Sequence, residues 1–138
     1  MDLGKAIYNI LVNNTPIQLI VGTKIFPMVA PTNTEFPFII YDIYNDDPTN
    51  DKDGVSTLDQ YDVRITAYSE QYTDVARLGD TTRTALDRVA TYPSTTYEGI
   101  KIQSISFRSQ QDEFDSDAGR RGVYRQELQF KIREIRTQ

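Results

Sequence analysis

Carboxylates are the chemically capable side chains that this sequence gathers most densely, and they lie in two polar stretches. The acids of residues 45–56 and of residues 110–122 are Asp46, Asp47, Asp51 and Asp53, and Asp112, Glu113, Asp115 and Asp117. Acids at this density are able to ligate calcium, or to catalyse hydrolysis when two of them share a cleft. The two stretches are therefore the first candidates for a functional site.

The spacing of these acids does not match that of a calcium-binding EF-hand loop. With Gly54 at the sixth place, Thr49 and Gln60 fall at the first and twelfth places, where aspartate and glutamate are needed. In the second stretch Gly119 comes one residue early and Gln126 falls at the twelfth place. We therefore expect solvated charge, with neither a metal nor a cofactor.

The composition excludes most other familiar catalytic constellations. The chain has no cysteine and no histidine, which removes thiolate nucleophiles, histidine bases and the commonest transition-metal ligand. The glycine-flanked arginine pair at residues 119–122 has no predicted helix start behind it, as a phosphate loop requires. No active site is predicted, although a carboxylate-based hydrolase remains an alternative among 20 acidic residues.

Length and charge narrow the class of protein further. A chain of 138 residues is long enough for one domain with a real core, and we expect residues 1–138 to form a single domain. The net charge of −5 argues against a protein that coats nucleic acid, since phosphate neutralisation needs a basic surface. No apolar run reaches membrane-spanning length, and no signal-peptide pattern opens the chain.

The clearest structural signal is a strand that leads directly into a helix. Apolar residues alternate from Tyr61 through Val63 and Ile65 to Ala67, which predicts a strand with one buried face. After Ser69 the apolar spacing changes to three or four as far as residue 90, which predicts a long amphipathic helix. A helix that follows a strand so closely is able to fold back across the sheet.

The remaining elements complete an α+β fold. We expect a helix near residues 3–13, a short helical turn that Thr15 caps and Gly22 ends, and strands at 36–44, 100–107 with a bulge or a strong twist at Ser104, and 124–133. The sum is a mostly antiparallel sheet of about four strands with two packed helices and two long polar loops, residues 45–56 and 110–122, each of them either a flexible loop or a solvated hairpin tip. The predicted core is Ile7, Leu11, Ile40, Val63, Ile65, Leu86, Val89, Leu128 and Phe130.

Several short motifs occur in an order that resembles the tail completion proteins of long-tailed phages and prophages. They are Lys24-Ile25-Phe26-Pro27, Ala30-Pro31, Phe36-Pro37-Phe38-Ile39-Ile40-Tyr41, Asp62-Val63-Arg64-Ile65-Thr66-Ala67-Tyr68-Ser69, Ala85-Leu86 and Tyr124-Arg125-Gln126-Glu127-Leu128-Gln129-Phe130-Lys131-Ile132. The motifs span nearly the whole chain and leave no large segment over. These tail completion, or tail terminator, proteins are small structural subunits that join head to tail.

The resemblance implies a structural virion protein rather than an enzyme. It implies a homo-oligomeric ring of six subunits, made in the bacterial host cytoplasm and placed at the head–tail junction. Its partners would be the tail tube protein and a head-completion or neck protein, with DNA passing through the lumen unbound. The open alternatives are the small hydrolase and a monomeric or dimeric regulatory module that binds protein.

The two polar stretches supply the expected contacts of such a subunit. The candidate interface residues are Asp46, Asp47, Asp51, Asp53, Asp112, Glu113, Phe114, Asp115, Asp117, Arg120 and Arg121. The charged members would pair with opposite charges on the next subunit or on the tube, and Phe114 would act as an apolar anchor. Because residues 110–122 hold only one large apolar side chain, we expect them to be mobile in the free subunit and to order on assembly.

The absence of complete calcium ligand sets leads to a first prediction. Calcium at millimolar concentration should leave the melting temperature where the same concentration of magnesium leaves it, because neither acidic stretch offers both end ligands. Differential scanning fluorimetry with the two salts makes the comparison. A rise with calcium alone would contradict the prediction.

Overall fold

The computed structural model describes residues 3–51, 54–91, 96–97, 100–115 and 122–135, and within these ranges it leaves aside the side chains of 46–51, 54–58, 88–91, 96–97, 100–101 and 135. The helices are α1 (Leu3–Val12), α2 (Thr15–Val21) and α3 (Tyr72–Thr91). The strands are β1 (Ile25–Pro27), β2 (Phe38–Asp51), β3 (Gly54–Ser69), β4 (Thr96–Tyr97), β5 (Ile100–Asp115) and β6 (Val123–Ile135).

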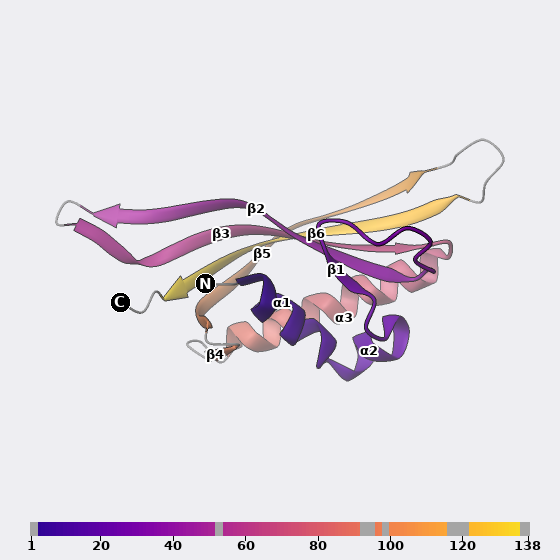
Figure 1. The fold of residues 1–138 in the computed structure, drawn as a ribbon, viewed down its shortest axis with the longest axis horizontal. Helices are drawn as coiled ribbons and strands as arrows, with labels where there is room; N and C mark the ends of the chain where they lie inside the picture. Colours follow the sequence, from indigo (N-terminus) through magenta and orange to yellow (C-terminus); the bar gives the residue numbers. More distant parts are fainter. Residues whose placement is uncertain (1–2, 52–53, 92–95, 98–99, 116–121, 136–138) are drawn as a thin grey trace.

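All six strands form one sheet in the order β1-β2-β3-β6-β5-β4, and the helices lie together on one of its faces (Figure 1). Only β1 runs parallel to its neighbour, while the other described pairs are antiparallel. The predicted α+β class is therefore confirmed. The sheet has more than the predicted four strands because two very short strands, β1 and β4, lie at its edges. The predicted helical turn is the short helix α2, which makes a third helix.

The predicted strand and helix around residues 61–90 are both present. The side chains of Tyr61, Val63, Ile65 and Ala67 are buried beneath the helices, as their alternation requires. In α3 the buried residues Val75, Leu78, Thr82 and then Ala85 and Leu86 follow three- and four-residue steps, and this face covers β3, β6 and β5. This strand–helix unit holds the middle of the sheet.

Most of the predicted core is confirmed. Among the predicted residues, the buried ones are Ile7, Leu11, Val63, Ile65, Leu86, Leu128 and Phe130. The assignment of Ile40 to the core is wrong, because its side chain is only partly buried. Ile39 and Tyr41, one position to either side, face the helices and are buried. The side chain of Val89 lies outside the described residues.

The two predicted polar loops are strands of two hairpins over their described residues, so the flexible-loop alternative is wrong there. Within residues 45–56, β2 continues to Asp51 and β3 begins at Gly54; within residues 110–122, β5 continues to Asp115. These segments pair along long antiparallel ladders, whose hydrogen bonds come from the main chain and need no apolar side chain. In Figure 1 the two hairpins point to opposite ends of the sheet: the β2–β3 hairpin extends past the helices, while the β5–β6 hairpin ends beside the start of α3.

Local details of the chain follow ordinary capping and bulge chemistry. Asn14, rather than the predicted Thr15, caps α2, because the Asn14 Oδ1 accepts a hydrogen bond from the Ile17 N–H at 3.1 Å. Gly22 ends α2 with φ 63°, as predicted from its glycine. A register shift between Ile102 and Ser104 confirms the predicted bulge.

The burial pattern predicts the cost of truncating the core. Ile65→Ala and Leu86→Ala should each lower the free energy of unfolding by about 2–5 kcal/mol, because each leaves a cavity under the helices. Ile40→Ala serves as the matched control and should cost clearly less, since Ile40 is only partly buried. Urea unfolding measures all three, and equal midpoints for Ile65→Ala and the wild type would contradict this assignment of the buried face.

Candidate subunit interface

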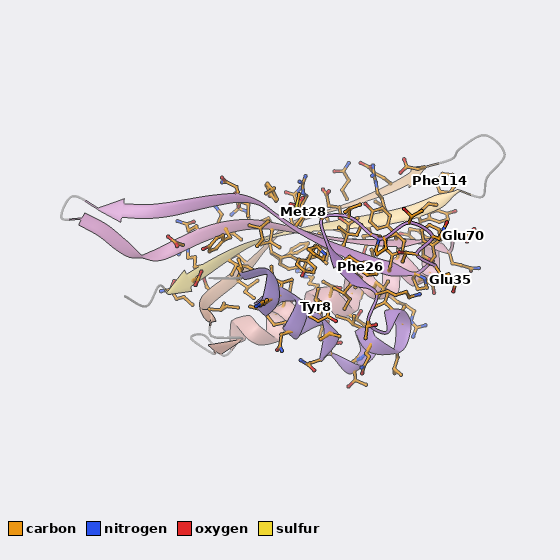
Figure 2. All side chains as sticks on the ribbon, in the orientation of Figure 1. Tyr8, Phe26, Met28, Glu35, Glu70 and Phe114 are labelled. Atoms are coloured by element: carbon orange, nitrogen blue, oxygen red, sulfur yellow. The ribbon has the colours of Figure 1, made fainter. Side chains whose placement is uncertain are left out.

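The second acidic stretch lies on the last part of β5, where strand alternation divides its residues between the two faces of the sheet. In register with β6, Asp112 lies opposite Gln126, Glu113 opposite Arg125, and Phe114 opposite Tyr124. Asp112 and Phe114 share the face on which the helices pack, while Glu113 lies on the open face. Figure 2 places Phe114 toward the outer end of the β5–β6 hairpin.

On the helix side, a chain of hydrogen bonds ties this hairpin to the start of α3. The Tyr72 hydroxyl donates to Asp112 Oδ2 at 3.0 Å, and the Gln126 Nε2 donates to Asp112 Oδ1 at 2.9 Å. The hydrogen bond to the negatively charged carboxylate raises the pKa of Tyr72 above its usual value. Asp112 is thus occupied by two donors of its own chain.

Gln126 reaches Asp112 because a glycine makes room for it in α3. Its side chain is only 3% exposed, and a Cβ at Gly79 would overlap the Gln126 carboxamide. The Gln126 Oε1 is buried and has no hydrogen-bond partner among the described residues. Gly79 therefore lets α3 approach β6 closely at this point.

Three rings form an aromatic cluster beside this chain, which we define as Tyr72, Phe114 and Tyr124. Phe114 and Tyr124 have ring centroids 4.6 Å apart, and Tyr72 meets Tyr124 edge-on at 5.6 Å. A Cβ at Gly122 would overlap the Phe114 ring, so the glycine provides the space for that ring. Phe114 nevertheless stays 51% exposed and Tyr72 48% exposed.

This packing corrects one expectation about residues 110–122. Their single large apolar residue, Phe114, already packs within the subunit. Its ring contacts Tyr124 of β6, which in turn contacts Tyr72 of α3. Residues 110–115 are a strand with cross-strand partners, so the prediction of a mobile loop is wrong for them. Asp117, Arg120 and Arg121 lie outside the described residues.

The open face of the sheet carries charges of both signs in close pairs. Arg125 pairs with Glu113 and lies 3.8 Å from Asp115. In the same way Arg64 pairs with Asp42 at 2.7 Å, which raises the pKa of Arg64. A further ion pair on this face joins Lys131 and Asp62 at 3.9 Å.

The first acidic stretch lies far from the second. Asp46, Asp47 and Asp51 are in β2, in register with Tyr61, Gln60 and Gly54 of β3. Their side chains, and Asp53 as a whole, lie outside the described residues. Because the two hairpins point to opposite ends of the sheet (Figure 1), the acids of the two stretches do not form one shared site.

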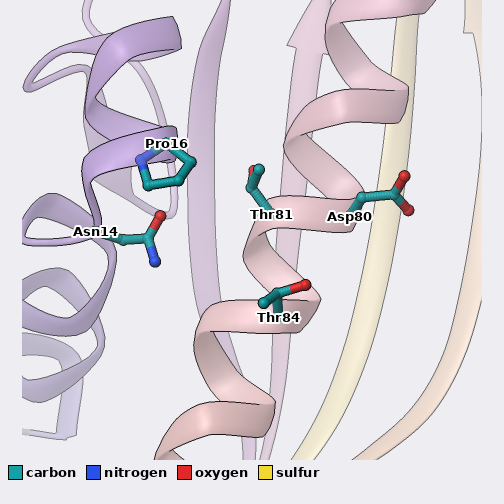
Figure 3. A pocket seen from close by; sticks show the side chains of 5 residues that line it. All are labelled: Asn14, Pro16, Asp80, Thr81 and Thr84. Atoms are coloured by element: carbon teal, nitrogen blue, oxygen red, sulfur yellow. The ribbon is translucent and has the colours of Figure 1, made fainter.

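The one depression shown in Figure 3 does not resemble a hydrolase site. It lies between α2 and α3, lined by Asn14, Pro16, Asp80, Thr81 and Thr84, so it holds one carboxylate rather than the pair that glycoside hydrolysis uses. The Thr81 hydroxyl is engaged with main-chain carbonyls of its own helix. Among the described residues, no group of three or more acids could hold a metal ion.

The longest described helix, α3, has 20 residues, and neither it nor the two shorter ones combine the length and apolarity of a membrane span. Charged residues such as Asp74, Arg77 and Asp80 interrupt its sequence.

Comparison with known proteins shows where this architecture occurs. No curated protein sequence matches the chain. Among solved structures, a chain of the virion of a native gene transfer agent particle has the same fold, with a TM-score of 0.74 and 16% sequence identity over 94% of this chain and 91% of that one. The sequence itself matches the family of the tail completion protein gp17 over residues 5–134. This chain therefore belongs to the tail completion protein gp17 family.

Proposed function

We propose that this protein is the subunit of a ring that closes the head-proximal end of a phage-type tail and joins that tail to the head. As a member of the tail completion family, the chain is a structural protein of a phage-type tail. The assembly of a ring, the position of that ring and its role in joining are our proposal beyond this family membership. The fold shared with a chain of a gene transfer agent virion is compatible with all three.

The observation that carries the proposal is the placement of two long hairpins at opposite ends of one sheet. A joining subunit has to present different surfaces to two partners that lie on opposite sides of it. The β2–β3 and β5–β6 hairpins point to opposite ends of the sheet (Figure 1), and a single helix-backed sheet fixes their separation. One hairpin would meet the head-side protein and the other the tail tube.

The two hairpins differ enough to recognise different partners. The β2–β3 hairpin carries Asp46, Asp47, Asp51 and Asp53 in its sequence and offers mainly negative charge. The β5–β6 hairpin combines acids, the basic pair Arg120 and Arg121, and the half-exposed aromatic cluster. An exposed aromatic surface rimmed by charge is typical of a protein-binding site.

Passage of DNA also fits the charges of the open face. Affinity for DNA comes mainly from basic side chains that neutralise phosphates. Here Arg64, Lys131 and Arg125 each lie beside an acid of the same face. In a ring with this face toward the lumen, those pairs and the net charge of −5 would weaken adhesion of DNA to the wall.

The placement of the subunit is tested on assembled particles. Immunogold or tagged-subunit electron microscopy of purified tails should show the protein as one ring at the head-proximal end. Signal distributed along the tube, or particles without the protein, would contradict the proposal.

The role of the β5–β6 hairpin is tested by charge reversal. Arg120→Glu and Arg121→Glu, alone and together, should block head–tail joining without lowering the melting temperature of the free subunit, because the charges would serve contacts between proteins. Arg77→Glu is the matched control, since Arg77 is an exposed arginine of α3 rather than of the hairpin sequence. Mixing variant tails with full heads and counting joined particles gives the result, and normal joining by the double variant would contradict this role.

A further inference from the structure

The sheet has two long outer edges that its own chain leaves largely uncovered. On one side β1 pairs only with Ile39–Tyr41 of β2, and the Met28 N–H adds a hydrogen bond to the Tyr41 carbonyl. On the other side β4 pairs only with Ile100 and Lys101 of β5. Within the part of the chain that the structure describes, no strand pairs with the outer edge of residues 42–51 or of residues 102–115.

Exposed edges of this length ordinarily cause unwanted association. An unpaired strand edge presents a row of N–H and C=O groups to any other strand, and monomeric proteins cover or shorten such edges. We propose that the outer edge of β2 in one copy pairs with the outer edge of β5 in the next copy, an inference that rests on the ring proposed above. The sheet would then continue from subunit to subunit around the ring.

The strand directions are compatible with this pairing. Along the order β2-β3-β6-β5 each described neighbour is antiparallel, so β2 and β5 of one subunit run in opposite directions. A rotation about an axis along the strands preserves these directions, so β5 of one copy would meet β2 of the next as an antiparallel pair. Contact between two different edges is the heterologous kind that closes a ring.

The charges of the two edges favour pairing of β2 with β5 over pairing of two β2 edges. Residues 42–51 of β2 include four aspartates and no basic residue, whereas residues 102–110 of β5 carry Arg108 as their one charged residue. Two β2 edges side by side would place acids against acids, which is unfavourable. The β5 edge adds no acid over residues 102–110 and brings one positive charge toward the β2 acids.

Two further observations favour a second copy of the chain at the β2 edge: the positions of the unpaired segments along the strands, and the exposed apolar residues nearby. Across the sheet, Asn45 lies in one row with Asp62, Lys131 and Ser106. The free part of β2 is therefore level with the part of β5 that carries small polar side chains. Where the free β2 edge begins, Met28 and Val29 remain 76% and 73% exposed, and Figure 2 places Met28 beside β2. A neighbouring copy would cover both.

Introduced thiols test the contact cleanly, because the natural chain has no cysteine. Asn45→Cys is combined in turn with Ser104→Cys, Ser106→Cys and Ser109→Cys, and assembled tails are oxidised and run on a non-reducing gel. Within one subunit β2 and β5 are three strand spacings apart, about 14 Å, which is too far for a disulfide. At least one pair should therefore give a ladder of linked subunits that collapses on reduction.

Matched variants separate this contact from others. Asn45→Cys with Thr84→Cys should give no ladder. Thr84 is also exposed, but it lies on α3 and not on the β5 edge that is proposed to meet β2. Asn45→Cys alone should give no dimer, and a dimer would instead indicate β2–β2 pairing and overturn the proposal. Rings visible by electron microscopy without a ladder from any of the three pairs would overturn the edge pairing alone. Tails without any ring would instead reject the proposed function on which it rests.

Discussion

The structure depends on one mismatch of length: the sheet is longer than the helices that bury one of its faces. Where α1 and α3 cover the strands, Val63 and Ile65 of β3 lie in register with Phe130 and Leu128 of β6, and all four are buried. At one end β2 and β3 continue past the helices, and at the other end β5 and β6 continue as a polar hairpin beside the start of α3; main-chain hydrogen bonds hold both. The covered part stabilises the fold, and the uncovered parts are free for contacts with other molecules.

Hydrophobic periodicity predicted the covered part and failed at the hairpins for the same reason. A strand is recognised in sequence by its one apolar face, so β3 and α3 were predictable from Tyr61 onward. The end of β2 extends past the helices, and the end of β5 holds polar residues on both faces apart from Phe114, so both have the composition of a loop. Ile40 shows a second limit: both faces of β2 are apolar there, and only the position of the helices selects Ile39 for the core.

The candidate interface could be predicted only in part. Its acids were evident from composition, but the partners of Asp112 come from α3 and β6, and sequence alone does not place Tyr72 or Gln126 beside it. Two glycines carried a usable signal. Gly79 within a long predicted helix, and Gly122 before an aromatic strand, are both positions where a side chain would collide with a neighbouring element.

The central claim is that the uncovered edges of this sheet are contact surfaces in the assembled tail. Hydrogen–deuterium exchange, followed by mass spectrometry on the free subunit and on purified tails, tests it most directly because it reports on main-chain hydrogen bonds. We expect residues 42–51 and 102–110 to exchange much more slowly in tails, with little change in the buried middle of β3. Equal exchange of both edges in the two states would contradict the account.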